Sequence, residues 1–255
     1  MFHWRRTVPA TRSGPSSVEV CFTDRSAGLG RPPWDGLNLG GHVGDDPARV
    51  EGNRTLLATS LGVPRDRLLF MQQVHGTDVA EVDGPWSGSV PEADAVITSV
   101  PDLALAVLVA DCVPVLLHDQ TAGLVAAVHA GRPGMTAGIV PLVVERMRHL
   151  GAGRLSAVVG PSVCGRCYEV PAAMAQAAAT VAPSALARSW TGTPAIDVAT
   201  GVVEQLARDD VEVEWVAGCT REDDDLYSYR RDGRTGRFAG VILRRAGTSG
   251  ATRAG

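Results

Sequence analysis

Residues 95–128 read AVITSVPDLALAVLVADCVPVLLHDQTAGLVAAV, and this stretch sets the character of the fold. It divides into four short apolar runs that are separated by Pro, Asp and Gly residues. Runs of this length, rich in valine and leucine and bounded by turn residues, are typical of strands, several of them buried on both faces. We therefore predict strands at 95–100, 103–109, 113–117 and 124–128.

Similar apolar runs occur on both sides of this stretch, and helical patterns lie between them. Further strands are expected at 18–22, 68–71, 155–159, 211–216 and 238–243. One helix has clear boundaries, because Asp45 and Asp46 supply a cap before the first-turn proline Pro47, and Gly62 follows its last residue, Leu61. Valine and leucine at helical spacing predict further helices at 138–150, 172–181 and 197–208.

The order of these elements predicts the fold class. The strands are grouped in the middle of the chain and do not alternate regularly with helices, which favours an α/β fold of the α+β type over a doubly wound sheet. A layered arrangement of sheets and helices is expected, and 255 residues are compatible with one domain or with two fused halves. Residues 246–255 are predicted to form a disordered tail.

The composition excludes several classes of function. The 255 residues are 45% hydrophobic and 20% charged with a formal net charge of −4, which is the composition of a folded protein without a basic face for nucleic acid or anionic membranes. No secretory signal or long apolar span is present, so we expect a cytoplasmic protein, a monomer or homodimer, that binds a small molecule. All 24 basic residues are arginines, which excludes Schiff-base chemistry and a P-loop lysine.

Three segments place a metal-capable side chain at the end of an apolar run. His75, Cys112 and His129 each stand beside glycine, proline or alanine, where the backbone can turn and direct the side chain into a pocket. The separations of 37 and 17 residues are too long for a zinc finger. A site built from them would be assembled by the fold, with three protein ligands and a fourth position open to water, as in catalytic zinc sites.

The residues themselves leave other interpretations open. Cys112 can be a small buried hydrophobe while the two histidines satisfy local hydrogen bonds. Cys112 can also be a thiolate nucleophile with His129 as its base, which needs no metal. A metal that only staples the strands would need a fourth protein ligand, for which His42 and Asp111 are candidates. The pair Cys164 and Cys167 has redox-motif spacing, but its proline-flanked loop favours a structural or incidental role.

A longer series of motifs resembles the YfiH-like family, also called the laccase-domain or polyphenol oxidase family, which includes purine nucleoside phosphorylases and peptidoglycan editing factors. The resemblance covers residues 18–243 in order, and its motifs are Leu37-Asn38-Leu39-Gly40, His42-Val43-Gly44-Asp45-Asp46-Pro47, Asn53-Arg54, Gln73-Val74-His75-Gly76, Ala93-Asp94, Ala110-Asp111-Cys112-Val113-Pro114, His129-Ala130-Gly131, Gly160-Pro161, Cys167-Tyr168-Glu169-Val170, Cys219-Thr220 and Ser228-Tyr229-Arg230-Arg231.

The resemblance implies a single catalytic domain of layered mixed β-sheets flanked by helices, which would span residues 18–245 after an N-terminal extension of residues 1–17. It also implies a zinc site whose ligands and catalytic groups are His75, Cys112 and His129, with copper as the other metal to consider. It implies phosphorolysis of adenosine, inosine, guanosine and methylthioadenosine, with adenosine deamination as a further activity. The partners would be a nucleoside and phosphate. Arg54 matches a family arginine expected near phosphate or substrate, and Asn38 is a weaker match of the same kind.

Two further points concern substrate. With no lysine in the chain, Arg230 or Arg231 would join Arg54 in binding phosphate, although a solvated basic turn is the plain alternative for both. Relatives usually continue His-Ala-Gly with Trp-Arg-Gly, whereas this chain has Arg132-Pro133-Gly134, which leaves the preferred substrate open.

Two rival enzyme classes follow from the same family. One is a Cys–His amidase that edits serine-containing UDP-MurNAc precursors of peptidoglycan. The other is a copper phenol oxidase. This is the weaker hypothesis, because multicopper sites need more histidines than the six in the whole chain. The sequence does not choose the native metal, the oligomeric state, or water against phosphate as the acceptor in the cell.

Overall fold

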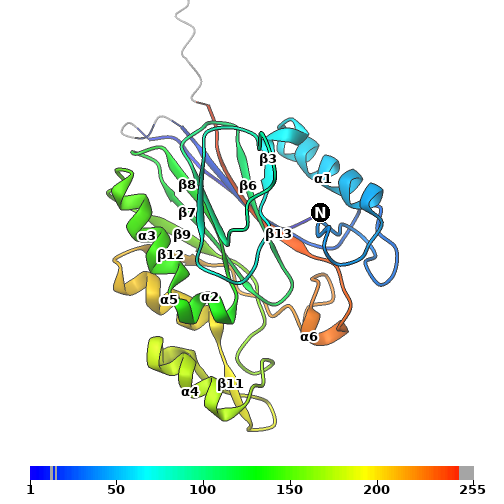
Figure 1. Cartoon of the computed structure of the whole chain (residues 1–255), viewed down its shortest axis with the longest axis vertical. Helices are drawn as coiled ribbons and strands as arrows, with labels where there is room; N and C mark the ends of the chain where they lie inside the picture. Colours follow the sequence, from blue (N-terminus) through cyan, green and yellow to red (C-terminus); the bar gives the residue numbers. More distant parts are fainter. Residues whose placement is uncertain (12–13, 15, 247–255) are drawn as a thin grey trace, which may run out of the picture.

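The computed structural model describes residues 1–11, 14 and 16–246, and its strands form two large sheets that pack face to face (Figure 1). In spatial order, the first sheet contains β1 (Phe2–Val8), β2 (Val18–Thr23), β13 (Phe238–Arg244), β6 (Ala104–Val109) and β3 (Leu68–Phe70). The second contains β12 (Glu212–Trp215), β9 (Ser156–Val159), β7 (Val113–Asp119), β8 (Leu124–Ala130), β5 (Ala95–Thr98) and β4 (Val79–Val82). A small hairpin joins β10 (Leu186–Arg188) to β11 (Pro194–Ile196).

Helices cover the two outer faces, so the layers run helix, sheet, sheet, helix (Figure 1). The helix α1 (Pro47–Leu61) packs on the first sheet, while α3 (Ile139–His149) and α5 (Val198–Arg208) pack on the second. The remaining helices are α2 (Arg132–Ala137), α4 (Ala172–Val181) and the short α6 (Tyr229–Asp232), with 3₁₀ turns at Arg65–Arg67 and Pro183–Ala185. This arrangement confirms the predicted fold class of layered mixed sheets flanked by helices.

Side chains along the central strands point alternately to the two faces of each sheet, and both faces are buried. In β6, Leu105 and Val107 point into the core between the sheets, whereas Ala104 and Ala106 point toward α1. In β7, Leu116 points into the core between the sheets, while its neighbours on either side face α3 and α5. Successive side chains on a strand point to opposite faces, so continuous apolar runs are what a sheet between two layers requires.

The predicted elements and the observed ones agree closely in the central region. All nine predicted strands are present, and the helix from Pro47 to Leu61 has Asp46 as its N-cap and Gly62 as its left-handed C-cap. The three other predicted helices match α3, α4 and α5 to within a residue or two. The strands β1, β4, β10 and β11 and the helices α2 and α6 were not expected.

The chain ends bear on the expected domain boundaries. Residues 2–8 of the expected N-terminal extension form β1, which pairs antiparallel with β2 at the edge of the first sheet. The expected disordered tail, apart from Ala246, lies outside the described residues. Within the part of the chain that is described, every helix is too short or too polar to cross a membrane.

We predict that Leu116→Ala lowers the free energy of unfolding by about 2–5 kcal/mol, because it opens a cavity in the core between the sheets. Urea denaturation followed by circular dichroism measures this loss. Leu186→Ala is the matched control: Leu186 also lies in a strand but is 54% exposed, so its loss should be small. Equal losses for the two variants would contradict the assignment of Leu116 to the core.

Candidate metal centre

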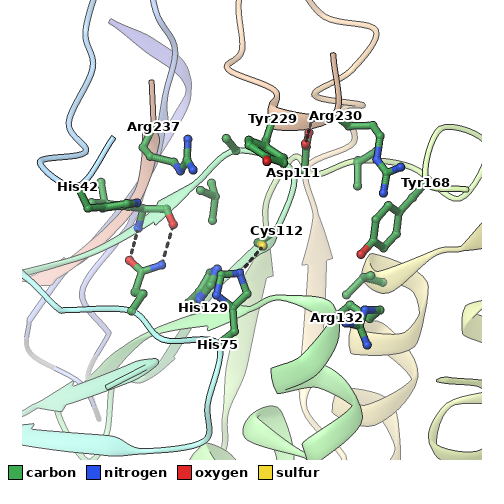
Figure 2. Close-up of a pocket in the computed structure, with 16 residues that line it drawn as sticks. His42, His75, Asp111, Cys112, His129, Arg132, Tyr168, Tyr229, Arg230 and Arg237 are labelled. Carbon is green, nitrogen blue, oxygen red and sulfur yellow. Dashed lines mark hydrogen bonds between the residues drawn. The ribbon is translucent and has the colours of Figure 1, made fainter. Parts of the chain in front are cut away.

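His75, Cys112 and His129 meet at one point between the two sheets. The imidazole nitrogens and the thiol all lie within 4.8 Å of one another. Cys112 Sγ is 3.5 Å from His75 Nε2, and the rings of His75 and His129 are 4.7 Å apart in a T-shaped arrangement. Figure 2 shows the three side chains together at the centre of the cavity.

Strand topology explains how ligands so far apart in sequence converge. β3 and β6 are parallel neighbours, so the segments that follow them, which carry His75 and Cys112, leave the first sheet at the same edge. β7 and β8 are antiparallel, so the start of β7 lies beside the end of β8, and Pro114 pairs with His129. Cys112 directly precedes β7 and is therefore close to His129. Cys112 therefore stands in the turn that passes from the first sheet to the second.

The loop that carries His75 is held by side-chain bonds. Gln73 donates from its amide to the carbonyl of Leu108 (2.7 Å) and accepts from the backbone N–H of Leu108 (2.8 Å), which ties the loop to β6. His75 itself has φ of 61° and Asp111 has φ of 90°, both in the left-handed region. Non-glycine residues there carry backbone strain and persist where surrounding bonds fix them, as happens at binding sites.

Asp94 supplies most of those bonds. Its buried carboxylate accepts the backbone N–H groups of Val74 (3.2 Å), His75 (3.0 Å) and Gly76 (2.6 Å), and lies 2.7 Å from Nδ1 of His129. Burial raises the pKa of the Asp94 carboxyl, but the bonds from His129 and Gly76 outweigh that effect and lower it. An ionised carboxylate only accepts, so Nδ1 of His129 carries the proton and Nε2 is left free to bind a metal.

Gly131 leaves room for the three ligands. A Cβ atom at this position would lie 2.6 Å from Cδ2 of His75, closer than Cβ contacts come in proteins, and 3.1 Å from the sulfur of Cys112. The donor set of two imidazole nitrogens and one thiolate suits Zn²⁺, and also copper, and three protein ligands leave one coordination position open. The residues present therefore fit a catalytic type of metal site.

Charge and proton position in the ligand set follow from the same contacts. Burial raises the pKa of the Cys112 thiol, but the charge of His129 and hydrogen bonds from both histidines bring it down to about 6. Burial lowers the pKa of His129. The Cys112 charge and the hydrogen bond to Asp94 raise this pKa by more, so the net shift is upward. Without metal, Cys112 and His129 form a thiolate–imidazolium pair at neutral pH.

The ligands open into a cavity of about 400 Å³, a size that holds small organic molecules. Among the described residues that line it, three carry guanidinium groups, Arg132, Arg230 and Arg237, and one carries a carboxylate, Asp111. Figure 2 shows His42 and Arg237 on one side of the ligands and Tyr168, Arg132 and Arg230 on the other. The cavity is therefore bordered by cations on two sides.

The Asp111 carboxylate is occupied by the protein itself. It accepts from the hydroxyls of Thr220 (2.6 Å) and Ser228 (2.7 Å) and from the backbone N–H of Arg230 (2.5 Å). It is not part of the group of ligand atoms around Cys112, and neither is His42. Burial and the nearby charges of Arg237 and Arg54 lower the pKa of His42, so this side chain is neutral. Neither candidate for a fourth protein ligand reaches the metal position.

Of the residues expected to bind substrate or phosphate, Arg230 lines the cavity, with its guanidinium carbon 4.8 Å from the centre of the Tyr168 ring. Arg54 lies outside the lining: its Nε donates to the carbonyl of Leu39 (3.0 Å), its guanidinium stacks on Phe70, and it borders a neighbouring pocket. The orientation of α1 turns this side chain toward Phe70 instead of the ligands.

Asn38 and Arg231 hold the backbone around the cavity. Asn38 is fully buried, accepts from the backbone N–H groups of Gly40 (3.0 Å) and Arg237 (2.9 Å), and does not border the cavity. Arg231 donates to the carbonyls of Thr220, Asp223 and Leu226. These contacts position loops, so the structure brings together the three ligands and Arg230 but not Asn38, Arg54 or Arg231.

Several lining or supporting residues carried no assigned role in the sequence analysis. Asp94 was visible only as part of an Ala-Asp motif. Tyr168 appears in the motif Cys167-Tyr168-Glu169-Val170 without a role of its own, and Arg237 gives no signal, because a lone arginine in a loop has no characteristic spacing. Arg132 was noted as a departure from the Trp-Arg-Gly pattern of relatives, and the structure places its side chain on the cavity wall at the start of α2.

Comparison with known proteins matches residues 19–245 to the model of a family described as multi-copper polyphenol oxidoreductase laccase. A purine nucleoside phosphorylase of Streptomyces coelicolor is 55% identical over 87% of this chain and 93% of its own length. A purine nucleoside phosphorylase of Streptomyces griseus is 50% identical over 93% of this chain and 97% of its own length. The crystal structure of YlmD from Geobacillus stearothermophilus superposes with a TM-score of 0.84 at 30% identity, covering 90% of this chain and 92% of that one.

We expect Asp94→Asn to weaken zinc binding by about 10- to 100-fold, because removing a carboxylate that orients a ligating histidine typically has that cost. Competition with a chromophoric chelator measures the dissociation constant. Asp83→Asn changes an exposed carboxylate and is the control. If Asp94→Asn and Asp83→Asn bind zinc equally tightly, Asp94 does not orient a metal ligand.

In the metal-free protein, the alkylation rate of Cys112 by iodoacetamide should rise through about pH 6, because its thiol loses the proton there and not near the ordinary value of 9.0. Bound zinc should suppress the reaction, since a coordinated thiolate is not free to attack. Residue-resolved mass spectrometry follows the modification. Cys21, buried with a raised pKa, is the internal control and should not react. Equal rates with and without zinc would exclude Cys112 as a ligand.

Proposed function

The chain belongs to the family described as multi-copper polyphenol oxidoreductase laccase, and from that premise we propose that it is a zinc-dependent purine nucleoside phosphorylase. Adenosine, inosine, guanosine and methylthioadenosine are the proposed substrates, with phosphate as the second reactant. One observation carries the proposal: the His75, Cys112 and His129 group lies in a cavity bordered by arginines, in a chain 55% identical to a protein named purine nucleoside phosphorylase. A cytoplasmic location is part of the same proposal.

Phosphate binding is supported by the charge distribution in the cavity. Arg132, Arg230 and Arg237 can each donate charge-assisted hydrogen bonds to a phosphate oxygen. The carboxylate that could repel the anion, Asp111, is already satisfied by two hydroxyls and a backbone N–H. An anion entering this cavity therefore meets three cations and one fully bonded carboxylate.

The rest of the lining suits a nucleoside. Leu108, Val109 and Val198 supply apolar surface, and Tyr168 and Tyr229 supply aromatic faces against which a purine can stack. Where relatives usually carry Trp-Arg after His-Ala-Gly, this chain has Arg132-Pro133, and the guanidinium of Arg132 borders the cavity. We infer that the base stacks on an aromatic face of the lining, at Tyr168 or Tyr229, and leaves the guanidinium groups of Arg132 and Arg230 to the phosphate (Figure 2).

In the proposed reaction, a phosphate oxygen forms a bond to C1′ of the ribose as the bond between C1′ and N9 breaks. The electron pair of that bond passes to the purine, which leaves as the free base after taking a proton, and ribose 1-phosphate is the other product. The arginines orient the phosphate and offset its charge, which lowers the barrier through positioning and electrostatics.

A bound zinc ion would supply Lewis acidity and an activated water, which is the chemistry that adenosine deamination at C6 requires as a second activity. The chain's own contribution is to fix the ligands. Asp94 keeps the proton of His129 on Nδ1, and the loop bonds of Gln73 keep His75 in place. Cys112 contributes one negative charge to the ligand set.

A second candidate is a Cys–His amidase acting on serine-containing UDP-MurNAc precursors. The observation that favours it is the lowered pKa of Cys112, to about 6, beside His129, which is the arrangement of an activated thiol nucleophile. In that case Asp94 would orient His129 as the third member of a catalytic set, and His75 would have no required part. The family description names a multi-copper oxidoreductase, but the metal-capable groups among the described residues contain two histidines between them, fewer than a multicopper site needs.

We predict that Arg132→Ala and Arg230→Ala each raise the KM for phosphate roughly ten- to a hundredfold, because each removes one charge-assisted hydrogen bond of about 1.5–3 kcal/mol. The KM for nucleoside should change less. Ribose 1-phosphate formation at varied phosphate concentration measures both. Arg154→Ala removes an 89% exposed arginine and is the control. An unchanged phosphate KM in both cavity variants would refute the proposed phosphate site.

His75→Ala separates the two enzyme classes. If the metal is required, this variant loses bound zinc and turnover of adenosine together, as Cys112→Ser does. If Cys112 and His129 act as the dyad of an amidase, His75→Ala keeps turnover of the UDP-MurNAc precursor without metal, and Cys112→Ser abolishes that turnover. Zinc content and product formation are measured on the same preparations, and full activity of metal-free His75→Ala would transfer the assignment to the amidase.

A further inference from the structure

A second group of metal-capable side chains lies next to residues that line the cavity, outside the site described above. Cys164, Cys167, Cys219 and Glu222 place their three thiols and a carboxylate oxygen within 4.8 Å of one another. We propose that these four residues bind a structural zinc ion. None of the four lines the cavity, so this site would be separate from the one at Cys112.

The two halves of the group have the same local geometry. Cys164 and Cys167 are three residues apart, and the backbone N–H of Cys167 donates to the carbonyl of Cys164 (2.9 Å). Cys219 and Glu222 are also three residues apart, and the backbone N–H of Glu222 donates to the carbonyl of Cys219 (3.0 Å). Two ligand pairs at this spacing, each on a tight turn, are the usual framework of a structural zinc site.

Backbone pairing brings the two turns together across more than fifty residues of sequence. Ser162 and Cys219 form a parallel β-bridge, in which Ser162 donates to the carbonyl of Gly218 (3.3 Å) and Thr220 donates to the carbonyl of Ser162 (3.1 Å). The backbone N–H of Cys164 also points at the sulfur of Cys219 (3.5 Å). The ligands are therefore already assembled by main-chain bonds.

The donor chemistry selects the metal. Three thiolates and one carboxylate give a complete tetrahedral set for Zn²⁺, with Zn–S distances of about 2.3 Å and no position left for substrate. Soft sulfur donors disfavour Mg²⁺ and Ca²⁺, which take oxygen ligands. The present spacing of up to 4.8 Å needs only a small inward movement to reach such a geometry.

Groups around the four residues fit the role of outer-sphere support. Arg221 Nη1 lies 3.6 Å from the sulfur of Cys167, and Trp190 Nε1 donates to Oε1 of Glu222 (3.1 Å). The guanidinium of Arg166 stacks on Trp190, 4.5 Å from the ring centre. Two arginines thus stand beside a site whose ligands carry four negative charges when deprotonated, and a hydrogen-bonded carboxylate is oriented as metal ligands usually are.

The position of the group indicates what the metal would do. Thr220, next to Cys219, donates to the Asp111 carboxylate (2.6 Å), and Val163, next to Cys164, donates to the Asp111 carbonyl (3.0 Å). Tyr168, next to Cys167, borders the cavity. A metal joining the two turns would therefore fix the residues that hold Asp111 and one aromatic wall.

The test is the zinc content of the whole protein, purified with Zn²⁺ present and dialysed against metal-free buffer. Wild type should retain two zinc ions per chain, Cys167→Ser and Cys219→Ser one, Cys112→Ser one, and the double variant Cys112→Ser with Cys167→Ser none. Cys21→Ser is the matched control, because Cys21 is a buried free cysteine in β2, and it should keep two. If Cys167→Ser and Cys219→Ser each retain as much zinc per chain as the wild type, the proposal is overturned.

Two measurements keep the test decisive if a cysteine variant fails to fold. In wild-type protein, bound zinc should protect Cys164, Cys167 and Cys219 from alkylation until a chelator is added, and Glu222→Gln, which changes an exposed side chain, should weaken that protection. In Cys112→Ser loaded with Co²⁺, thiolate-to-cobalt charge transfer should be present, since the remaining site holds three thiolates. A disulfide among these cysteines in the purified protein, or cobalt binding without charge transfer, would overturn the proposal.

Discussion

The carboxylate of Asp94 holds together two of the three segments from which the candidate metal centre is built, those that carry His75 and His129. It receives three successive backbone N–H groups of the loop that carries His75 and the Nδ1 proton of His129, while its own carbonyl accepts from the backbone N–H of His129 (2.7 Å). Both histidines are therefore fixed relative to one buried charge. An unpaired carboxylate at this depth would be strongly unfavourable, so the loop and β8 must adopt these positions for the sheets to close.

The parts of the fold that could be predicted from sequence are those with local signals. The strand at residues 103–109 is a continuous apolar run, and the helix from Pro47 to Leu61 has a cap at each end, so both were expected within a residue or two of their observed bounds. β1 was missed because an edge strand with Arg5 and Arg6 half in solvent does not look apolar. α2 was missed because it is six residues long and begins with Arg132, Pro133 and Gly134.

The candidate site divides along the same line. His75, Cys112 and His129 were visible because strand ends, turn residues and ligand chemistry coincide at each. The surroundings were not: Arg237 lines the cavity, and its backbone is held by Asn38, almost two hundred residues earlier in the chain. Arg54 shows the opposite case. Its motif suggested a contact with phosphate or substrate, but packing on Phe70 sets the direction of its side chain. Side-chain direction depends on tertiary contacts that no local pattern carries.

The passage of the chain from one sheet to the other at Cys112 has a consequence for the life of the protein in the cell. Because the candidate ligands come from both sheets, metal binding and the packing of the two sheets against each other are thermodynamically coupled. Free metal at a hundred times its dissociation constant adds about 2.7 kcal/mol to the stability of the folded state. If the bound metal is the proposed zinc, a larger fraction of molecules would open when zinc becomes scarce and would meet the proteases that degrade unfolded chains. The abundance of this protein would then follow the zinc supply, without a dedicated sensor.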